Sequence, residues 1–370
     1  MPASEPVTPA PSAPAAPRAV HATEELSAAD VRVMLTAPSR EGLLDLLGIT
    51  GTDAHELLPQ ADAVAADAEL LAEVTTIANR LRAEAGLETT AVDLAADKER
   101  LDALQQRLLP GEGLLVILAA VVSTATVRAW HTARGLTAEQ SWHVLADLGQ
   151  QMRVHRSGTG RLGLHQLNWV SLNWAGRLVH LGRLQFDLHR RAIHDAPERW
   201  VLGTHIPATG PLDPSAVEES FAAATAYFTG HYPELQEDRG PDAPRFGHEF
   251  VCDSWLISDA FAEITGPESN LARFAALWDR IAVQENAADG ALFFTFGLRP
   301  PVDARSLPRR TRLERAVADR RADGRGWTGG GGGPGGGGVF RPPPGGGGFV
   351  APPPGGGTGG GRGKKGPAGV

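Results

Sequence analysis

The stretch Trp200-Val-Leu-Gly-Thr-His-Ile-Pro-Ala-Thr-Gly-Pro-Leu-Asp-Pro-Ser215 decides the fold of this chain. Its first part, Arg199–Ile206, predicts a strand with one apolar face, and His205 lies on the opposite face. Two prolines then end strand pairing, and Asp213 with Pro214 predicts the start of a helix. A sharp turn from a strand into a helix N-terminus favours anions, because free N–H groups and the positive end of the helix dipole lie there. The stretch is therefore a suitable place to hold a phosphorylated cofactor.

The elements around this stretch predict a mixed sheet. The helix that follows places four apolar side chains on one face, at Val217, Phe221, Ala224 and Phe228. If this helix crosses back over the sheet, the next apolar run, Phe250–Ile257, is a strand parallel to Arg199–Ile206. Upstream, Trp169–Trp174 and Leu178–Leu188 have an extended pattern, so we expect an antiparallel meander before the crossover.

The rest of the foldable chain divides into helices, loops and one closing hairpin. Two strand-like runs, 271–283 and 291–299, predict the hairpin. Residues 27–109 are rich in Ala and Leu and are helical in pattern. The longest apolar run, Gly113–Val127, is shorter than the roughly 20 residues of a membrane helix, so we expect a buried core helix. The glycines of 157–163 match G-x-G-x-x-G, but they follow a helix and not a strand, so a loop is the better interpretation.

Four segments follow from these patterns, and their fold class is α+β. Residues 1–22 are rich in Pro and Ala, and residues 329–370 are Gly runs broken by prolines, so both segments are predicted to be disordered. Residues 23–160 form a predicted helical domain, and residues 161–328 form a predicted mixed sheet flanked by helices. A frame error in a GC-rich gene is a second interpretation of the tail.

Composition argues against several classes of protein. A formal net charge of −8 argues against nonspecific nucleic-acid binding. The single cysteine, Cys252, excludes an internal disulfide and fits a reducing compartment. The N-terminal residues lack the apolar run of a signal peptide, so we expect a cytoplasmic protein without a membrane segment. Because no His/Cys spacing indicates zinc and no Walker loop is present, we expect no metal.

The predicted order of elements resembles the GNAT N-acyltransferase fold, in which a meander, a crossover helix to a parallel strand, a second helix and a hairpin follow one another. Short sequence motifs are also similar to those of actinobacterial acyltransferase domain-containing proteins, which join an N-acyltransferase N-terminal helical domain to a GNAT-like C-terminal domain. The motifs span residues 112 to 327 and include Leu181-Gly-Arg-Leu-Gln-Phe186, His205-Ile-Pro207, Gly210-Pro-Leu-x-Pro214, His231-Tyr-Pro233, Cys252-x-Ser-Trp-Leu256, Ser269-Asn-Leu-x-Arg-Phe274 and Leu307-Pro-x-x-Thr-x-Leu-x-Arg-Ala-Val317.

The resemblance implies transfer of an acyl group from acyl-CoA to an amine by direct attack on the thioester. It also implies that the turn and two positions further along contact the CoA donor, namely Thr209, Gly210, Leu212, Ser215, Asn270 and Arg273. The pyrophosphate is expected at the turn and the helix start, and an ordinary capped helix is the alternative. Two GNAT signatures are missing. Residues 207–214 replace the Arg/Gln-x-x-Gly-x-Gly/Ala loop, and Phe261 lies in the helix where many GNAT enzymes carry a tyrosine as general acid.

Three side chains near the parallel strands are candidates for catalysis. His205 can remove a proton from the attacking amine, and a strand histidine bonded to a neighbouring carbonyl is the alternative. Asp253 can orient a histidine or bind the amine, or it can form a structural ion pair. Cys252 can accept the acyl group only if a base activates it, so a buried free cysteine is the preferred interpretation. A backbone N–H where the two parallel strands separate can polarise the thioester carbonyl.

The sequence therefore predicts a GNAT-like N-acyltransferase that uses acyl-CoA and a small-molecule amine acceptor. A catalytically inactive GNAT-derived module that binds acyl-CoA or another ligand is one alternative, because both GNAT signatures are missing. A scaffolding protein that recruits partners through its Gly/Pro tail is another.

Overall fold

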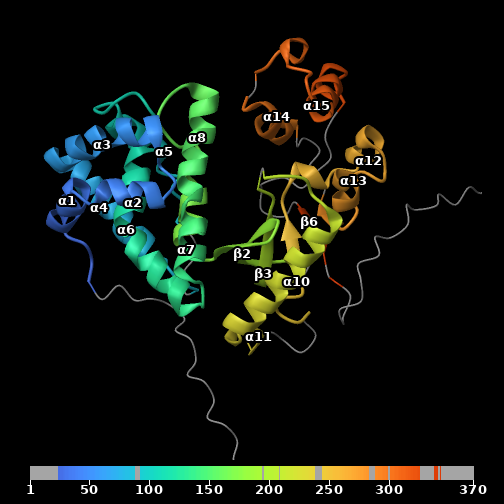
Figure 1. Ribbon diagram of the computed structural model, residues 1–370, viewed down its shortest axis with the longest axis horizontal. Helices are drawn as coiled ribbons and strands as arrows, with labels where there is room; N and C mark the ends of the chain where they lie inside the picture. The colour runs from blue at the N-terminus through green and yellow to red at the C-terminus, as the bar shows by residue number, and fades with distance from the viewer. Residues whose placement is uncertain are drawn as a thin grey trace, which may run out of the picture.

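The structure is a computed structural model that describes residues 24–87, 92–193, 196–207, 209–237, 244–282, 288–298, 301–325, 337–340 and 342. A helical domain comes first and a domain built on a six-stranded sheet follows (Figure 1). The helices of the first domain are α1 (Ala28–Thr36), α2 (Arg40–Leu46), α3 (Gly51–Ala66), α4 (Ala68–Ala83), α5 (Lys98–Gln105), α6 (Leu114–Ala133), α7 (Ala138–Leu145), α8 (Asp147–Thr159) and α9 (Leu167–Trp174).

The central helix of the first domain is α6, which packs against α4 and α9. By length and composition α6 could cross a membrane, but 78% of its apolar window is buried inside the protein. The helix begins after Gly113, whose φ of 69° lies in the left-handed region, and a Cβ at this glycine would lie 2.6 Å from the carbonyl oxygen of Leu164. The prediction of a buried core helix is confirmed.

The second domain contains six strands and several helices. In chain order they are β1 (Leu178–Leu181), β2 (Leu184–Arg191), β3 (Arg199–His205), α10 (Pro214–His231), α11 (Glu234–Glu237), β4 (Phe250–Cys252), the 3-10 helix η1 (Trp255–Ile257), α12 (Ala260–Thr265), α13 (Asn270–Ala275), β5 (Asp279–Ala282), α14 (Ala288–Phe296), the 3-10 helix η2 (Ala304–Ser306), α15 (Arg312–Ala322) and β6 (Gly337–Phe340).

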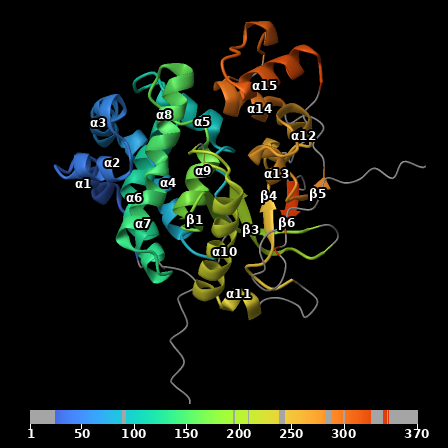
Figure 2. The ribbon, with the colours of Figure 1, turned by 45° about the vertical axis from the view of Figure 1, so that its right-hand side comes forward.

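The strand order of the sheet is β1-β2-β3-β4-β6-β5. The first three strands are antiparallel, and β3 and β4 are parallel, with Leu202 opposite Phe250. Helix α10 covers the apolar face of the sheet (Figure 2), where the ring of Phe221 lies 4.7 Å from that of Phe250. The predicted crossover helix and parallel strand are confirmed, whereas the antiparallel meander consists of β1, β2 and β3 and does not include Trp169–Trp174. The predicted N-cap is also present, because the side chain of Asp213 accepts from two backbone N–H groups of the first turn.

The parallel strands separate at one end. Gly203 is the last residue of β3 that pairs with β4, and β3 continues beyond it to His205. β4 ends at Cys252. The chain after β4 turns into η1, so the predicted strand over Phe250–Ile257 has only three residues. This opening between β3 and β4 is the separation of strands that the sequence predicts.

Two other predicted strands are helices. Trp169–Trp174 lies in α9, where Leu167, Val170 and Trp174 are buried at helical spacing. The run 291–299 lies mainly in α14, which packs against α15 and η1. Short apolar runs fit both kinds of element, and packing against the rest of the protein decides between them.

The last strand comes from the Gly/Pro-rich tail. β6 lies between β4 and β5 and pairs antiparallel with both. Gly338 fits there because a Cβ at this position would lie 2.7 Å from the Cβ of Trp278, and the ring of Phe340 lies 4.8 Å from that of Phe221. The prediction of disorder for 329–370 is therefore wrong for 337–340. The predicted disorder of residues 1–22 lies outside the described residues.

Candidate active site

One face of the sheet carries a row of polar side chains. In β2, Phe186 and Leu188 point toward α10, so Gln185, Asp187 and His189 point to the opposite face. The register between β2 and β3 places Asp187 opposite Gly203 and Gln185 opposite His205. Residues of two strands, far from one another in the sequence, therefore share this face.

Asp187 binds two histidines, one with each carboxylate oxygen. Nε2 of His205 lies 2.7 Å from Oδ1 of Asp187, and Nδ1 of His189 lies 2.8 Å from Oδ2. The carboxylate is buried at 3% exposure, whereas the imidazoles of His205 and His189 are 31% and 33% exposed. Because a carboxylate only accepts hydrogen bonds, each of these ring nitrogens donates, and the other nitrogen of each ring is left to act as a base or an acid. Neither of these other nitrogens has a partner in the described part of the chain.

The charges of this cluster reinforce one another. Burial works to raise the pKa of Asp187, but the charges and hydrogen bonds of His189 and His205 outweigh it and hold that pKa well below its usual range. Burial works against a positive charge on His189, but the carboxylate of Asp187 prevails and raises the pKa of His189. Asp187 is therefore an anion at neutral pH, and it favours a proton on the neighbouring imidazole.

Gly203 makes room for the carboxylate. A Cβ at Gly203 would lie 2.0 Å from Oδ1 of Asp187 and 2.9 Å from Cε1 of His189. The missing side chain lets the carboxylate lie flat over β3, between the two imidazoles. Gly203 is thus a part of the site that contributes no functional group.

Gly203→Ala is expected to reduce turnover about 100-fold, because displacing a catalytic group by about 1 Å can have an effect of that size. The extra methyl group should also reduce the free energy of unfolding by about 1–3 kcal/mol. Thiol release and thermal unfolding measure the two effects. The control is Gly230→Ala in α10, where a Cβ meets no atom within 4 Å. Turnover of Gly203→Ala equal to that of the control would contradict this role.

The helical domain reaches the site through Trp169 of α9. The ring centroid of Trp169 lies 4.8 Å from that of His205, edge to face. The indole N–H of Trp169 donates to Oδ2 of Asp147, at the start of α8. Burial raises the pKa of Asp147, while the hydrogen bond from Trp169 opposes that shift. The two domains therefore meet at His205, and its imidazole has a fixed wall on one side.

Asp253 lies near the site, on the same face as His205. Both of its carboxylate oxygens accept from Nη1 of Arg191, at 3.0 and 2.8 Å. Burial raises the pKa of Asp253, against the charges of Arg191, His189 and His205. The structure thus shows the ion pair that the sequence offered as an alternative, and the carboxylate bonded to His205 is Asp187. Sequence analysis missed Asp187 and His189, although their alternation with Phe186 and Leu188 was a signal.

Models of two known domain families match the chain. A model of an N-acyltransferase N-terminal domain matches residues 38–176, and a model of a GNAT-like C-terminal domain matches residues 178–333. The chain belongs to this two-domain N-acyltransferase family. Helix α9 falls within the first match, and the sheet begins with the second. No curated protein sequence matches the chain.

Solved acyltransferase structures have the same fold. A mutant acyltransferase in complex with octanoyl-CoA is 24% identical, covers 82% of this chain and 88% of its own, and has a TM-score of 0.65. An acyltransferase in complex with CoA and 10C-teicoplanin is 23% identical, covers 83% and 88%, and has a TM-score of 0.64. One in complex with decanoyl-CoA and teicoplanin is 24% identical, covers 86% and 100%, and also has a TM-score of 0.64.

Cys252 of this N-acyltransferase family member lies on the opposite face of the sheet from His205. It is 1% exposed and belongs to the apolar cluster beneath α10. Burial raises the pKa of its thiol, so the thiol stays protonated at neutral pH. The structure contradicts a role as nucleophile, because no base of the site reaches this face, and it shows the buried free cysteine that the sequence favoured.

The start of α10 is capped by the side chain of Asp213. Oδ1 of Asp213 accepts from the backbone N–H of Ser215 at 3.0 Å and from that of Ala216 at 3.4 Å, and the hydroxyl of Ser215 also donates to it at 2.7 Å. A negative carboxylate therefore occupies the position that the sequence assigned to the cofactor. The structure shows the capped helix that the sequence offered as the alternative, and the cap argues against a pyrophosphate at the helix start.

The side chain of Arg183 stabilises the turn before α10 through hydrogen bonds. The guanidinium of Arg183 donates to the carbonyl oxygens of the turn, at Pro207, Gly210 and Pro211. Thr209 and Gly210 are exposed, whereas Leu212 is buried in the core at 5% exposure. Thr209 and Gly210 remain open to a ligand, and Leu212 does not.

The other two predicted CoA contacts lie on α13. Asn270 is the first residue of this helix, which Ser269 caps by accepting from the N–H of Ala272. Arg273 pairs with Glu268 at 2.5 Å. Both positions are explained by the local structure of a short helix, and the structure does not bring them to His205.

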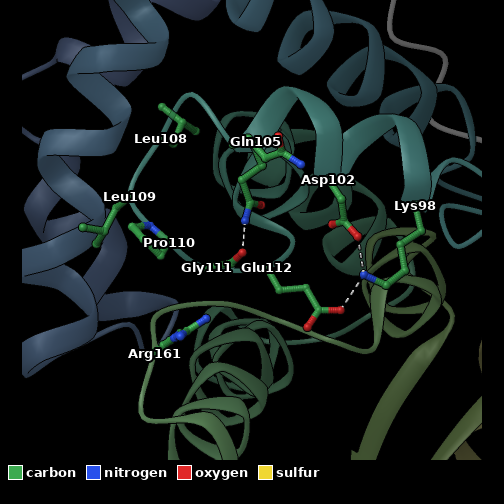
Figure 3. A pocket seen from close by; sticks show the side chains of 10 residues that line it. Lys98, Asp102, Gln105, Leu108, Leu109, Pro110, Gly111, Glu112 and Arg161 are labelled. Carbon is green, nitrogen blue, oxygen red and sulfur yellow. Dashed lines mark hydrogen bonds and ion pairs between the residues drawn. The ribbon is translucent and has the colours of Figure 1, made fainter.

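A separate pocket of about 490 Å³ lies in the helical domain (Figure 3). It is lined by α5, the loop that follows α5, and Arg161, so no residue of the sheet takes part. Nζ of Lys98 lies 2.6 Å from Asp102 and 2.7 Å from Glu112, which leaves its charge neutralised. Among the described residues, no group of three or more His, Cys, Asp or Glu is arranged to hold a metal ion.

Proposed function

We propose that the protein transfers an acyl group from an acyl-CoA thioester to the amine of a small-molecule acceptor. The observation that carries this proposal is the pair of Asp187 and His205, which lies on the partly open face of the sheet where β3 and β4 separate. The family of the chain and the acyl-CoA bound to the solved acyltransferases support it. We also propose the cytoplasm as its location, on the basis of the single cysteine.

The chemistry follows from the tautomer of His205. Nε2–H donates to Asp187, so the lone pair of Nδ1 faces away from the carboxylate and can accept a proton. The amine nitrogen attacks the thioester carbonyl, the C–N bond forms, and its proton passes to Nδ1 of His205. The C–S bond breaks and CoA leaves as its thiolate, with the electron pair of that bond on sulfur. Asp187 stabilises the imidazolium that forms, as the aspartate of a catalytic triad does.

The end of the pairing between β3 and β4 suits the same reaction. Backbone N–H groups at the ends of separated parallel strands are free to polarise the carbonyl oxygen of the thioester. Trp169 closes one side of His205 and reduces the access of water. The site thus combines a base, an oriented carboxylate and a partly closed pocket wall.

The experiment that tests this function has two steps. Calorimetric titration measures binding of octanoyl-CoA and decanoyl-CoA, and a thiol-release assay then measures turnover with a panel of amines that includes teicoplanin. We expect binding and amine-dependent thiol release. Binding without release supports the inactive binding module, and absence of binding to every acyl-CoA overturns the proposal. The scaffolding alternative predicts that deletion of residues after 342 abolishes the cellular function.

His205→Gln is expected to reduce turnover about 10²–10⁴-fold and to leave acyl-CoA affinity nearly unchanged. Glutamine retains an N–H donor near the position of Nε2, so Asp187 keeps its hydrogen bond while the base is lost. The control is His55→Gln, at an exposed position of α3. A rate for His205→Gln close to that of the control would remove His205 as the base.

A further inference from the structure

We propose that His189 is a second proton-transfer residue of the site, which protonates the departing thiolate while His205 accepts the proton of the amine. This inference rests on the proposed acyl transfer and adds the residue that takes the place of the missing tyrosine. Nδ1 of His189 and Nε2 of His205 bind the two oxygens of the same carboxylate, at 2.8 and 2.7 Å. Two imidazoles with opposite protonation states can therefore share one anion.

The geometry leaves His189 free to act. Its imidazole is 33% exposed, and among the described residues its Nε2 has no partner. His189 and His205 lie on the same face of the sheet, on either side of Asp187, whose carboxylate fills the space above Gly203. A tetrahedral adduct above Asp187 can therefore meet Nδ1 of His205 on one side and Nε2 of His189 on the other.

The surrounding charges favour this division of roles. Asp187 and Asp253 favour a proton on His189, and Arg191 disfavours it, with a net effect that raises the pKa of His189. Trp169 packs against His205 and places no charge on it, while Asp147 behind the indole is buried. The surrounding charges therefore favour the protonated form of His189, which is the form that a general acid needs.

Protons and electrons balance in the transfer step. The amine gives its proton to Nδ1 of His205, the C–N bond forms, and the C–S bond breaks with its electron pair on sulfur. Nε2–H of His189 gives its proton to that sulfur, so His205 ends protonated and His189 neutral. The total charge of the two imidazoles and Asp187 is unchanged. The site resets when Nδ1 of His205 gives its proton to solvent water and Nε2 of His189 takes one up, while Nδ1 of His189 and Nε2 of His205 keep their hydrogen bonds to Asp187.

The test compares two variants that each retain the hydrogen bond to Asp187. Asparagine in His189→Asn keeps an N–H near the position of Nδ1, and glutamine in His205→Gln keeps one near Nε2. Each variant is assayed with the same acyl group as its CoA thioester and as an aryl thioester, whose more acidic thiol leaves without an acid. With acyl-CoA we expect His189→Asn to lose about 100-fold in kcat, with little change in KM. With the aryl thioester we expect a loss below about threefold, whereas His205→Gln loses about 100-fold or more with both donors.

The pH profile gives an independent readout. A general acid must be protonated, so the rate of the wild type with acyl-CoA should fall as the pH rises through the pKa of His189, and His189→Asn should lack that alkaline limb. Equal losses with both donors and an intact alkaline limb would show that His189 only positions Asp187, and would overturn the inference. A wild-type rate for His189→Asn overturns it as well. Absence of thiol release by the wild type would instead disprove the proposed function itself.

Discussion

Asp187→Asn is expected to reduce turnover about 10³-fold while acyl-CoA still binds. The neutral amide no longer stabilises an imidazolium, and its NH₂ group can force His205 into the tautomer that exposes N–H where the base needs a lone pair. Asparagine has nearly the same shape as aspartate, so the space over Gly203 stays filled. Steady-state thiol release and calorimetric titration measure the two quantities. The effect should exceed that of any other carboxylate on this face.

The comparison variant is Asp253→Asn, whose carboxylate binds Arg191 and not a histidine. We expect it to lose about tenfold or less in turnover, because its charge reaches the histidines only through space. A larger loss for Asp253→Asn than for Asp187→Asn would reverse the assignment and return the orienting role to Asp253.

The same substitution should change the pH dependence of stability. The folded pKa of Asp187 lies below its unfolded value, so its contribution to stability is present above about pH 4 and is lost as the pH falls through the folded pKa. The folded pKa of His189 is raised, so its contribution is present below about pH 6.5 and is lost as the pH rises through the folded pKa. Asp187→Asn should weaken both trends in the free energy of unfolding.

Arg134→Met is expected to reduce the free energy of unfolding by about 3–5 kcal/mol. The side chain of Arg134, 0% exposed, lies at the end of α6 and joins the two domains. Its guanidinium binds Glu234 at 2.7 Å and the carbonyl of His231 at 2.7 Å, and it lies against the rings of Trp130 and Tyr232. Methionine fills part of the volume but leaves the Glu234 carboxylate and the carbonyl without their partner. Urea unfolding followed by tryptophan fluorescence measures the loss.

The matched control is Arg128→Met on the same helix. Arg128 lies 3.8 Å from the ring of Trp142, without an ion pair to any described carboxylate, and is only partly buried. Its replacement should reduce the free energy of unfolding by about 1 kcal/mol or less. Similar losses for the two variants would show that volume, and not the buried ion pair, determines the effect at Arg134.

Local patterns predicted much of this fold. The strand ending at His205, the cap at Asp213 and the apolar face of α10 depend on residues near one another in the chain, and all are present. Trp169–Trp174 alternates as a strand does, but six residues are too few to distinguish this pattern from that of a helix, and packing decides for the helix. The prediction of a strand also hid the contact between Trp169 and His205.

The sequence by itself determined the helical first domain, the crossover to a parallel strand and His205 as a polar group beside the strand opening. Only the tertiary structure decided which carboxylate binds His205, because the register between β2 and β3, and not sequence distance, brings Asp187 to it. The tertiary structure also places part of the glycine-rich tail in the sheet as β6. Only a glycine fits at position 338 against Trp278, and Phe340 packs in the core beside Phe221. Both outcomes depend on contacts between distant segments, which no local pattern contains.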